Sequence, residues 1–370
     1  MGVNPGDDFI RCGIEYLMKQ VIPGYKAYYI NKHEFRRASS RWWHLCKKAG
    51  SIHRNIEGCS IDSDGNGDLL AASDIVIQAG TPFYYKLPSG KSSATTRWIQ
   101  NTWGDCILRR KHKAGILILG VGTCQPFYSD GLEFYEDKKL VRFMKVTNRL
   151  AELTVVRDPL GKRVFDKLNL QAYLLPCPAI FAGDHYGIRP EGTKIVAMNY
   201  MPYGGHYKLG QQIDGRRWES TFVEIYKQLV KRYKVVILCH SEDEIRDLRN
   251  IIPDADVFFS TNYRDYLDIY SRVQFGIFNR VHSAIALSGF GRPSVIVGAD
   301  TRARMGELLG IPVCFVDKAT PDALLGYISS FETESTEWNT KLRQIKESAQ
   351  QEYLKLLSSS VGRLLERVKL

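Results

Sequence analysis

Short apolar runs alternate with amphipathic stretches along the whole chain. The runs that we interpret as strands buried on both faces are 27–30, 74–77, 115–119 and 153–156 in the first half. The strand candidates in the second half are 194–198, 235–239, 275–278, 294–297 and 313–316. Apolar residues recur at helical spacing between several of them, most clearly over 7–21, 159–168 and 222–233. This alternation of strands and helices predicts parallel sheets that are covered by helices on both faces.

A polar, glycine-rich stretch at 183–192 interrupts the alternation, and a new strand is predicted straight after it. We therefore place a boundary near residue 188, between an N-terminal domain over 1–188 and a C-terminal domain over 189–332. The tail, 333–370, carries apolar residues at steps of three to five, which predicts one long amphipathic helix or two helices broken at 358–360.

The predicted fold class is α/β, with two doubly wound Rossmann-like domains in a glycosyltransferase-B-like arrangement and a C-terminal amphipathic helix. In such an arrangement the active site lies in the cleft between the domains, at the carboxyl ends of the strands.

Composition narrows the class of protein. The 370 residues exceed the usual size of a single core, and 44% hydrophobic with 25% charged residues excludes a disordered or fibrous chain. No apolar run approaches the ~20 residues of a membrane helix. The chain starts without an export signal, and its eight cysteines are scattered without a CxxC pair. We therefore expect a cytoplasmic protein without a disulfide framework or zinc site.

The charge balance favours anionic partners, because 51 Lys and Arg against 40 Asp and Glu give a net charge of +11. We interpret the compact basic run at 109–113 as a solvated turn. A turn at 62–67 resembles the start of a calcium loop, but Ser73 stands where the bidentate carboxylate is needed, so we interpret it as a surface turn. The sequence motifs of serine hydrolases, zinc proteases and P-loop NTPases are absent.

The strongest candidate for chemistry is a predicted buried strand that ends in Asn279 and Arg280, followed by an apolar helix that begins at His282. Arg280 and His282 then lie beside a helix N-terminus, which attracts anions. Arginine binds phosphate or carboxylate through its planar fork, and histidine transfers protons near neutral pH. A structural arginine and a capping histidine explain this segment about equally well.

A second predicted strand ends in Arg157 and Asp158, and Pro159 follows where the first turn of a helix tolerates it. Arg157 would point into the same cleft from the other domain. The alternative is a local Arg157–Asp158 ion pair that caps the next helix. At the N-terminus, Asp7 or Asp8 could cap the first helix, or the glycine-flanked backbone could meet a ligand.

These segments resemble the polysaccharide pyruvyltransferase family in order and spacing. The residues that carry the resemblance are Asn4-Pro5-Gly6-Asp7, the predicted strand that leads to Gly80, Val156-Arg157-Asp158-Pro159, Pro176-Cys177-Pro178-Ala179, Arg280-Val281-His282-Ser283-Ala284, Gly291-Arg292-Pro293 and Asp300-Thr301-Arg302. The chain departs from the family pattern at Ala79, Cys177, Asn279 and Arg302, where the family usually has Gly, Asp, Gly and Lys. Three residues precede Asn4, so we expect the family's first strand to be short or missing.

The resemblance implies a transferase that uses phosphoenolpyruvate to place a pyruvate ketal across two hydroxyls of a glycan residue, with release of phosphate, in surface or exopolysaccharide biosynthesis. It implies that His282 is the catalytic acid or base and that Arg157 and Arg280 bind the anionic donor. The other substrate-binding residues that we expect are Arg302, Asn4, Asp7 and Gly80.

The resemblance also implies the partners. These are phosphoenolpyruvate, on the side of the C-terminal domain, and a saccharide acceptor, on the side of the N-terminal domain, with the loops 81–96 and 200–216 as acceptor loops. No cofactor, metal or nucleic acid is expected. A lipid-linked acceptor and a peripheral association with the inner face of the membrane stay open, and the sequence predicts no oligomeric state.

Two other functions fit parts of the pattern. A glycosyltransferase of the same architecture would use a nucleotide sugar, but the only carboxylate between His282 and the tail that could grip a ribose, Glu307, lacks a partner pattern. A basic, non-catalytic protein that binds glycan or nucleic acid would use its aromatic residues for stacking, but no nucleic-acid-binding module is recognisable.

Overall fold

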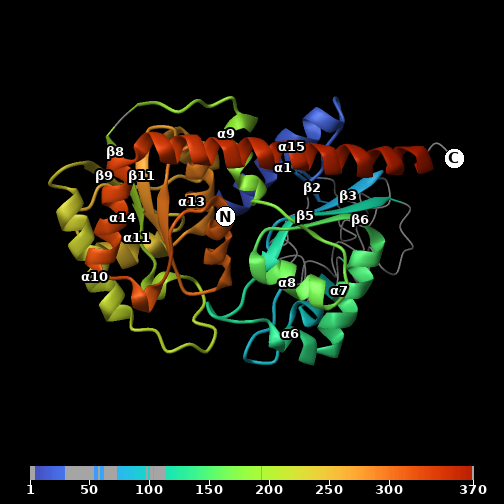
Figure 1. Cartoon of the computed structure of the whole chain (residues 1–370), viewed down its shortest axis with the longest axis horizontal. Coiled ribbons are helices and arrows are strands. Elements are labelled where there is room, and N and C mark those ends of the chain that lie inside the picture. Colours follow the sequence, from blue (N-terminus) through green and yellow to red (C-terminus); the bar gives the residue numbers. More distant parts are fainter. Residues whose placement is uncertain are drawn as a thin grey trace.

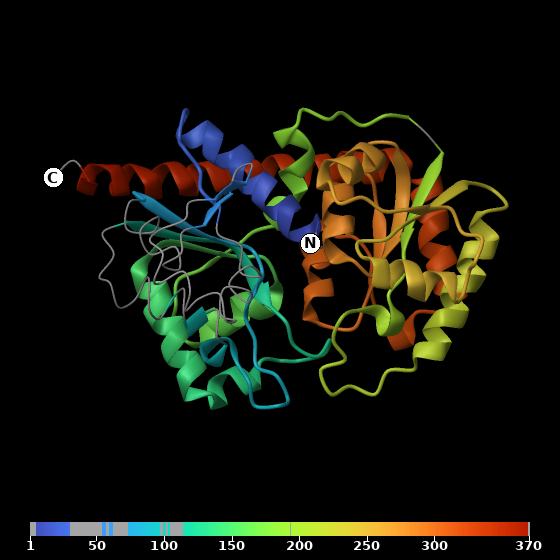
Figure 2. The ribbon, with the colours of Figure 1, turned by 180° about the vertical axis from the view of Figure 1, so that it is seen from behind.

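The computed structural model describes residues 5–29, 54–56, 59–61, 73–96, 99–100, 103, 114–192 and 194–368. It consists of two layered bodies that lie side by side, each built around a parallel β-sheet (Figure 1). The long helix α15 (Ser335–Val368) crosses both bodies along one side. The N-terminal end of α1 (Pro5–Val21) points to the place where the bodies meet (Figure 2).

The first sheet has the strand order β3-β5-β6-β7, and all of these neighbours are parallel. The strands are β3 (Ile75–Ala79), β5 (Gly115–Thr123), β6 (Ala151–Val156) and β7 (Tyr173–Leu174), and β4 (Pro82–Tyr84) pairs with the end of β5. Leu117 and Leu119 of β5 belong to the core that contains α1, whereas Ile116 and Ile118 belong to the core that contains α7 (Lys138–Leu150) and α8 (Pro159–Lys167). Helices therefore cover both faces of this sheet.

Further elements of the first body are short. They are β1 (Arg54–Ile56), β2 (Cys59–Ile61), η1 (Ser93–Thr95), α6 (Leu132–Glu136), η3 (Pro178–Phe181) and α9 (Ala182–His185).

The second sheet has the order β10-β9-β8-β11-β12-β13 and is parallel throughout. Its strands are β8 (Ile195–Asn199), β9 (Lys234–Leu238), β10 (Val257–Phe258), β11 (Val273–Phe278), β12 (Ser294–Gly298) and β13 (Val313–Phe315). This is the Rossmann order, in which the direction of strand addition reverses between the first and fourth strands, here β8 and β11. Ligands of such sheets bind beyond the carboxyl ends of the strands at this switch point.

Helices cover both faces of the second sheet as well. One face carries α10 (Gly215–Leu229), α11 (Glu242–Arg249) and α14 (Pro321–Thr333), and the other carries α12 (Tyr263–Tyr270) and α13 (Val281–Ser288). The connections contain the short helices η4 (Pro202–Gly204), η5 (Thr301–Leu309) and η6 (Val316–Lys318).

One hydrophobic core extends from the first sheet to the second. It includes Leu119 of β5, Leu287 of α13 and Tyr353 of α15, all of which are fully buried. Helix α1 lies so close to η3 that a Cβ at Gly13 would be 1.7 Å from the carbonyl oxygen of Pro178, so only glycine fits there. The two bodies therefore share a core and do not meet only at polar surfaces.

The predicted α/β class with two parallel sheets, each covered on both faces, is confirmed. The tail forms a single helix, α15, which continues through 358–360. Arg363 donates to the hydroxyls of Ser359 and Ser360, so these serines are satisfied without breaking the helix.

Two strand predictions need correction. Residues 27–29 form no strand, and the ring of Tyr29 lies 4.9 Å from the guanidinium of Arg11, so this run covers a charged side chain of α1 instead of joining a sheet. Strand β3 is partly exposed along its whole length, because among the described strands only β5 pairs with it.

Some predictions lie outside the described residues or stay predictions. Ile30, the turn at 62–67 and the basic run at 109–113 belong to the first group. The boundary near residue 188 falls between α9 and β8, and it stays a prediction. Within the described ranges, no helix has the length and apolar character needed to cross a membrane.

Candidate active site

Arg157 follows β6 directly, at the carboxyl end of the first sheet. Its backbone nitrogen donates to the carbonyl oxygen of Val121, which extends the pairing of β6 with β5 by one residue. The carboxylate of Asp158 caps α8, because it accepts from the backbone nitrogens of Gly161 and Thr123, each at 2.7 Å. No salt bridge between Arg157 and Asp158 is found among the described residues. Asp158 therefore caps α8 without the help of Arg157.

The guanidinium of Arg157 is buried, with 1% of the residue exposed. Its Nη1 donates to Nε2 of His282 at 3.1 Å and lies 3.7 Å from Sγ of Cys177. Burial raises the pKa of the Cys177 thiol, so the sulfur supplies no negative charge. Nε and Nη2 of Arg157 have no hydrogen-bond partner among the described residues. A buried cation with two unpaired donors is unfavourable unless an anion binds it.

His282 stands in the first turn of α13 and is partly exposed. A guanidinium can only donate, so Nε2 of His282 accepts from Arg157 and carries no proton. Burial, Arg157 and the more distant Arg302 lower the pKa of His282 well below its ordinary value. A Cβ at Gly6 would lie 2.6 Å from Nδ1 of His282, so this glycine lets the start of α1 approach the ring. The imidazole is therefore neutral and is held between α13, α1 and Arg157.

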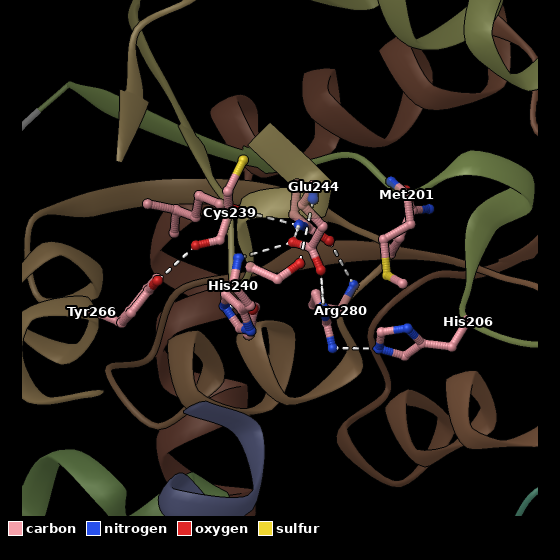
Figure 3. A network of polar contacts seen from close by, with 12 residues as sticks. Met201, His206, Cys239, His240, Glu244, Tyr266 and Arg280 are labelled. Atoms are coloured by element: carbon pink, nitrogen blue, oxygen red, sulfur yellow. Dashed lines mark hydrogen bonds and ion pairs between the residues drawn. The ribbon is translucent and has the colours of Figure 1, made fainter. Parts of the chain in front are cut away.

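Arg280, just before α13, has a carboxylate partner. Its Nε donates to Oε1 of Glu244 at 2.8 Å, Nη2 contacts the same oxygen, and Nη1 donates to Nε2 of His206 at 2.5 Å (Figure 3). Glu244, on the first turn of α11, also accepts from the backbone nitrogen of His240 at 2.9 Å and from Nδ2 of Asn199 at 3.2 Å. Asn199 ends β8 and Arg280 follows β11, so this network occupies the switch point of the second sheet.

Two further histidines belong to the network. Desolvation and the charges of Arg280 and Arg302 lower the pKa of His206 to about 3. His240 is buried, its Nε2 lies 3.4 Å from the hydroxyl of Ser283, and burial followed by Arg280 and His206 lowers its pKa well below the ordinary value. Both imidazoles are therefore neutral, and arginines provide the positive charge here.

Arg302 is paired in the same way as Arg280. Its Nε and Nη2 donate to the two carboxylate oxygens of Asp300 at 2.8 and 2.6 Å, and its guanidinium carbon lies 5.3 Å from the centre of the Tyr207 ring. The intervening Thr301 places its hydroxyl 3.1 Å from that of Thr123 on β5. The segment that carries Arg302 therefore contacts the first body close to the cap of α8.

Three other residues were predicted to bind substrate. Gly80 has φ +54°, and a Cβ there would lie 2.6 Å from Ile10 and 3.4 Å from Nη1 of Arg157, so Gly80 lies beside the buried arginine. Asp7 lies, partly buried, in the first turn of α1. Asn4 lies outside the described residues. The structure thus brings Arg157, His282 and Gly80 together, with Arg280 and Arg302 on the second body.

The sequence-based reasoning missed Glu244, His206 and His240. Ser241 and Glu244 have the spacing of a capping box. That spacing predicts that Glu244 caps the start of a helix, and it does not predict an ion pair with Arg280. The predicted cleft between the bodies stays a prediction, because the surface hollows that we find, of about 410 and 340 Å³, lie around Arg189 and Pro190. The described residues contain no group of three or more His, Cys, Asp or Glu that could hold a metal.

Comparison with known proteins gives one family and several distant structures. The family model described as polysaccharide pyruvyl transferase matches residues 3–301. No curated protein matches the chain.

Among solved structures, the wall teichoic acid polymerase TagF is similar with a TM-score of 0.48 and 10% identity, over 96% of this chain and 85% of that chain. The S. aureus protein MnaA, solved with UDP, has a TM-score of 0.47 and 8% identity, over 92% of this chain and 89% of that one. The E. coli heptosyltransferase WaaC, solved with ADP, has a TM-score of 0.45 and 13% identity, over 90% and 96%. At these values the similarity carries no argument about activity.

Proposed function

The chain belongs to the polysaccharide pyruvyl transferase family, and on this premise we propose that it transfers pyruvate from phosphoenolpyruvate to a glycan residue as a ketal and releases phosphate. The family supports a role in pyruvyl transfer during glycan biosynthesis. The donor and the ketal product are our additions. The observation that supports them is Arg157, a buried arginine with two unpaired donors beside His282.

The charge of Arg157 favours an anionic donor. Its guanidinium contacts the neutral thiol of Cys177 and the neutral ring of His282 and forms no ion pair among the described residues, since the nearby carboxylate of Asp158 is taken by the cap of α8 and by Thr123. Phosphoenolpyruvate carries a phosphate and a carboxylate, and either group would accept from Nε and Nη2 in the planar, two-pronged manner that arginine favours. Binding would remove the cost of burying an unpaired cation.

The reaction needs proton transfers at defined atoms. A proton added to the methylene carbon of phosphoenolpyruvate leaves an oxocarbenium-like centre at the adjacent carbon, and one sugar hydroxyl attacks it and loses its proton. A second hydroxyl then attacks the same carbon, the bond from that carbon to the phosphate oxygen breaks, and phosphate leaves with its electron pair. The second hydroxyl also loses its proton, so two protons are released, one is used at the methyl group and one goes to phosphate.

His282 is the residue that we assign to these transfers. As a neutral imidazole it is ready to act as a base towards a sugar hydroxyl, provided that its Nε2 is released from Arg157. A donor anion that also accepts from Nη1 of Arg157 would free Nε2 of His282, and its negative charge would raise the pKa of His282, which then takes up a proton from solvent. His282 gives this proton to the methylene carbon and, once it is neutral again, accepts the proton of the attacking sugar hydroxyl.

Arg280 and Arg302 would act differently from Arg157. Each is already paired with a buried carboxylate, Glu244 and Asp300 respectively. We propose that they add positive potential around the donor at the carboxyl edge of the second sheet, with direct contacts through the guanidinium atoms that face away from those carboxylates. Gly80 and Asp7 would line the donor site from the first body.

We propose no cofactor, and phosphoenolpyruvate is a substrate. The acceptor is a saccharide in surface or exopolysaccharide synthesis. A lipid-linked acceptor would bring the enzyme to the inner face of a membrane as a peripheral protein.

The test is release of phosphate from phosphoenolpyruvate with galactose-, glucose- and N-acetylmannosamine-containing acceptors, together with thermal unfolding in the presence of each donor. We expect phosphate release with at least one acceptor, and a rise in melting temperature with phosphoenolpyruvate alone, because a ligand that binds only the folded state stabilises it. A rise with UDP- or GDP-sugars and none with phosphoenolpyruvate would favour a glycosyltransferase instead.

A further inference from the structure

The loop between β8 and α10 has a strained backbone. Tyr203 and Leu209 have φ values of +60° and +51°, in the left-handed region that non-glycine residues avoid, and Gly204 and Gly210 follow them at +70° and +77°. Left-handed conformations of this kind are unfavourable for non-glycine residues and persist where surrounding contacts impose them, often at ligand sites. We name residues 203–211 the tyrosine loop.

Contacts at three points fix the tyrosine loop. His206 accepts from Arg280, and Tyr207 lies against Arg302. The side chain of Gln211 accepts from the backbone nitrogen of Phe127 at 3.1 Å and donates to the carbonyl oxygen of Ala299 at 2.7 Å. The loop is therefore tied to both site arginines of the second body and to the segment after β5 of the first.

The exposed groups on this loop are not explained by packing. Tyr207 is 52% exposed although it is a large ring in a tethered loop, and His206 beside it is also exposed. Nε2 of His206 accepts from Arg280 and the ring is neutral, so the ring proton is on Nδ1. Nδ1 can therefore donate a hydrogen bond to a ligand. A rigid aromatic face flanked by a few polar groups is the usual composition of a small-molecule site.

We propose that Tyr207 is the platform on which a pyranose ring of the saccharide acceptor stacks, with Nδ1 of His206 donating to a sugar hydroxyl. A pyranose has an apolar face of C–H groups that suits an aromatic ring, and a hydroxyl edge that suits the flanking donor. The inference rests on the proposed function, since it uses the acceptor which that function requires. It places part of the acceptor on the second body, beside Arg302, within the loop 200–216 that the sequence analysis names as an acceptor loop.

The test uses three variants of the full chain. Tyr207→Ala removes the ring, Tyr207→Phe keeps the ring without the hydroxyl, and Tyr28→Ala is the matched control. Tyr28 is a 46% exposed tyrosine with Lys26 Nζ 5.1 Å from its ring centre, on the segment after α1. Saccharide binding is measured by saturation-transfer NMR with the methyl glycosides of galactose, glucose and N-acetylmannosamine, and turnover by phosphate release from phosphoenolpyruvate.

We expect Tyr207→Ala to weaken saccharide binding and to raise the acceptor KM by about tenfold, while the donor KM stays within about twofold. Tyr28→Ala should behave like the unchanged protein, and Tyr207→Phe, which keeps the ring, should rescue the saccharide binding that Tyr207→Ala loses. Equal saccharide binding by Tyr207→Ala and the unchanged protein, or no binding of any of the glycosides, would overturn the platform. If glycosides bind through Tyr207 but phosphoenolpyruvate is never turned over, the platform stands and the proposed function fails.

Discussion

Two arginine–histidine pairs flank the start of α13, and they differ in what balances the arginine. In both pairs a guanidinium nitrogen donates to Nε2 of a neutral imidazole, Arg157 to His282 and Arg280 to His206. Arg280 also forms an ion pair with the buried carboxylate of Glu244, whereas Arg157 forms no ion pair with a carboxylate among the described residues. The same pair of side chains is therefore charge-balanced on the second body and unbalanced where the bodies meet.

The difference separates two uses of the same type of contact within one molecule. A balanced pair stabilises the fold, because every donor of the arginine that is buried finds an acceptor. An unbalanced pair destabilises the ligand-free protein, because a buried charge lacks a counter-charge. An anion that binds there removes this penalty, and the free energy regained adds to the affinity for the anion. The predictions below test this contrast, and each changes either a member of one pair or the carboxylate that balances Arg280.

The largest effect is expected from His282→Asn, which keeps a hydrogen-bonding tip but cannot transfer a proton. We expect normal folding by circular dichroism, retained binding of phosphoenolpyruvate, and a turnover about two to four orders of magnitude lower in phosphate release. His185→Asn on α9, outside the site, is the control and should turn over normally. Unchanged turnover in His282→Asn would make this histidine a structural residue.

Removal of the balancing carboxylate should destabilise the fold. In Glu244→Gln the buried Arg280 loses its charged partner, so we expect the free energy of unfolding to fall by about 2–4 kcal/mol in denaturant titrations. Glu332→Gln is the matched control, because its partner Arg232 is 56% exposed, and it should cost less than about 1 kcal/mol. A similar fall in the free energy of unfolding in both variants would show that burial of the Arg280–Glu244 pair does not determine its contribution to stability.

Removal of the unbalanced arginine should act in the opposite direction. Arg157→Met fills a similar volume without a charge, so we expect the ligand-free protein to gain about 1–3 kcal/mol of stability. The rise in melting temperature on addition of phosphoenolpyruvate should disappear in the same variant. A destabilised Arg157→Met that still responds to phosphoenolpyruvate would mean that Arg157 has a structural role.

The smallest effect is a pH dependence. The pKa of His282 is lowered in the folded protein relative to the ordinary 6.5, so the unfolded chain binds a proton that the folded chain does not. This contribution to stability is therefore present above about pH 6.5 and is lost as the pH falls, at up to about 1.4 kcal/mol per pH unit. Urea unfolding should show a steeper loss for the unchanged protein than for His282→Asn between about pH 6.5 and 5.

The response to the donor should have the opposite sign. A bound anion favours protonated His282, so binding of phosphoenolpyruvate should take up a proton. Calorimetry in two buffers with different ionisation enthalpies measures this uptake, and His282→Asn should abolish it. Equal uptake in both proteins would assign the proton to another group.

The sequence predicted the positions of the strand ends but not the contacts made there. Apolar runs followed by Arg157 and Arg280 place both arginines at carboxyl edges, because burial on both faces leaves a strand no polar residue until it ends. The pairing with Glu244 depends on the Rossmann order of strands, which places β8 between β9 and β11, so that Glu244 after β9 and Arg280 after β11 meet across the end of β8. Local spacing carries no information about that order.

The status of Arg157 could not be predicted either. Asp158 is its neighbour in sequence, and a local ion pair was a reasonable alternative. The carboxylate is instead used by the cap of α8 and by Thr123, a residue 35 positions away. Whether a charge is balanced thus depends on competition for acceptors in three dimensions.

The core that runs from β5 through α1 and α13 to α15 has a consequence for how the molecule comes apart. The chain passes once from the first sheet to the second, between Leu174 and Ile195, yet α1 from the start and α15 from the end both pack into the shared interior. A protease cut in that connection would leave two fragments that stay associated, and heating should melt both sheets in one transition.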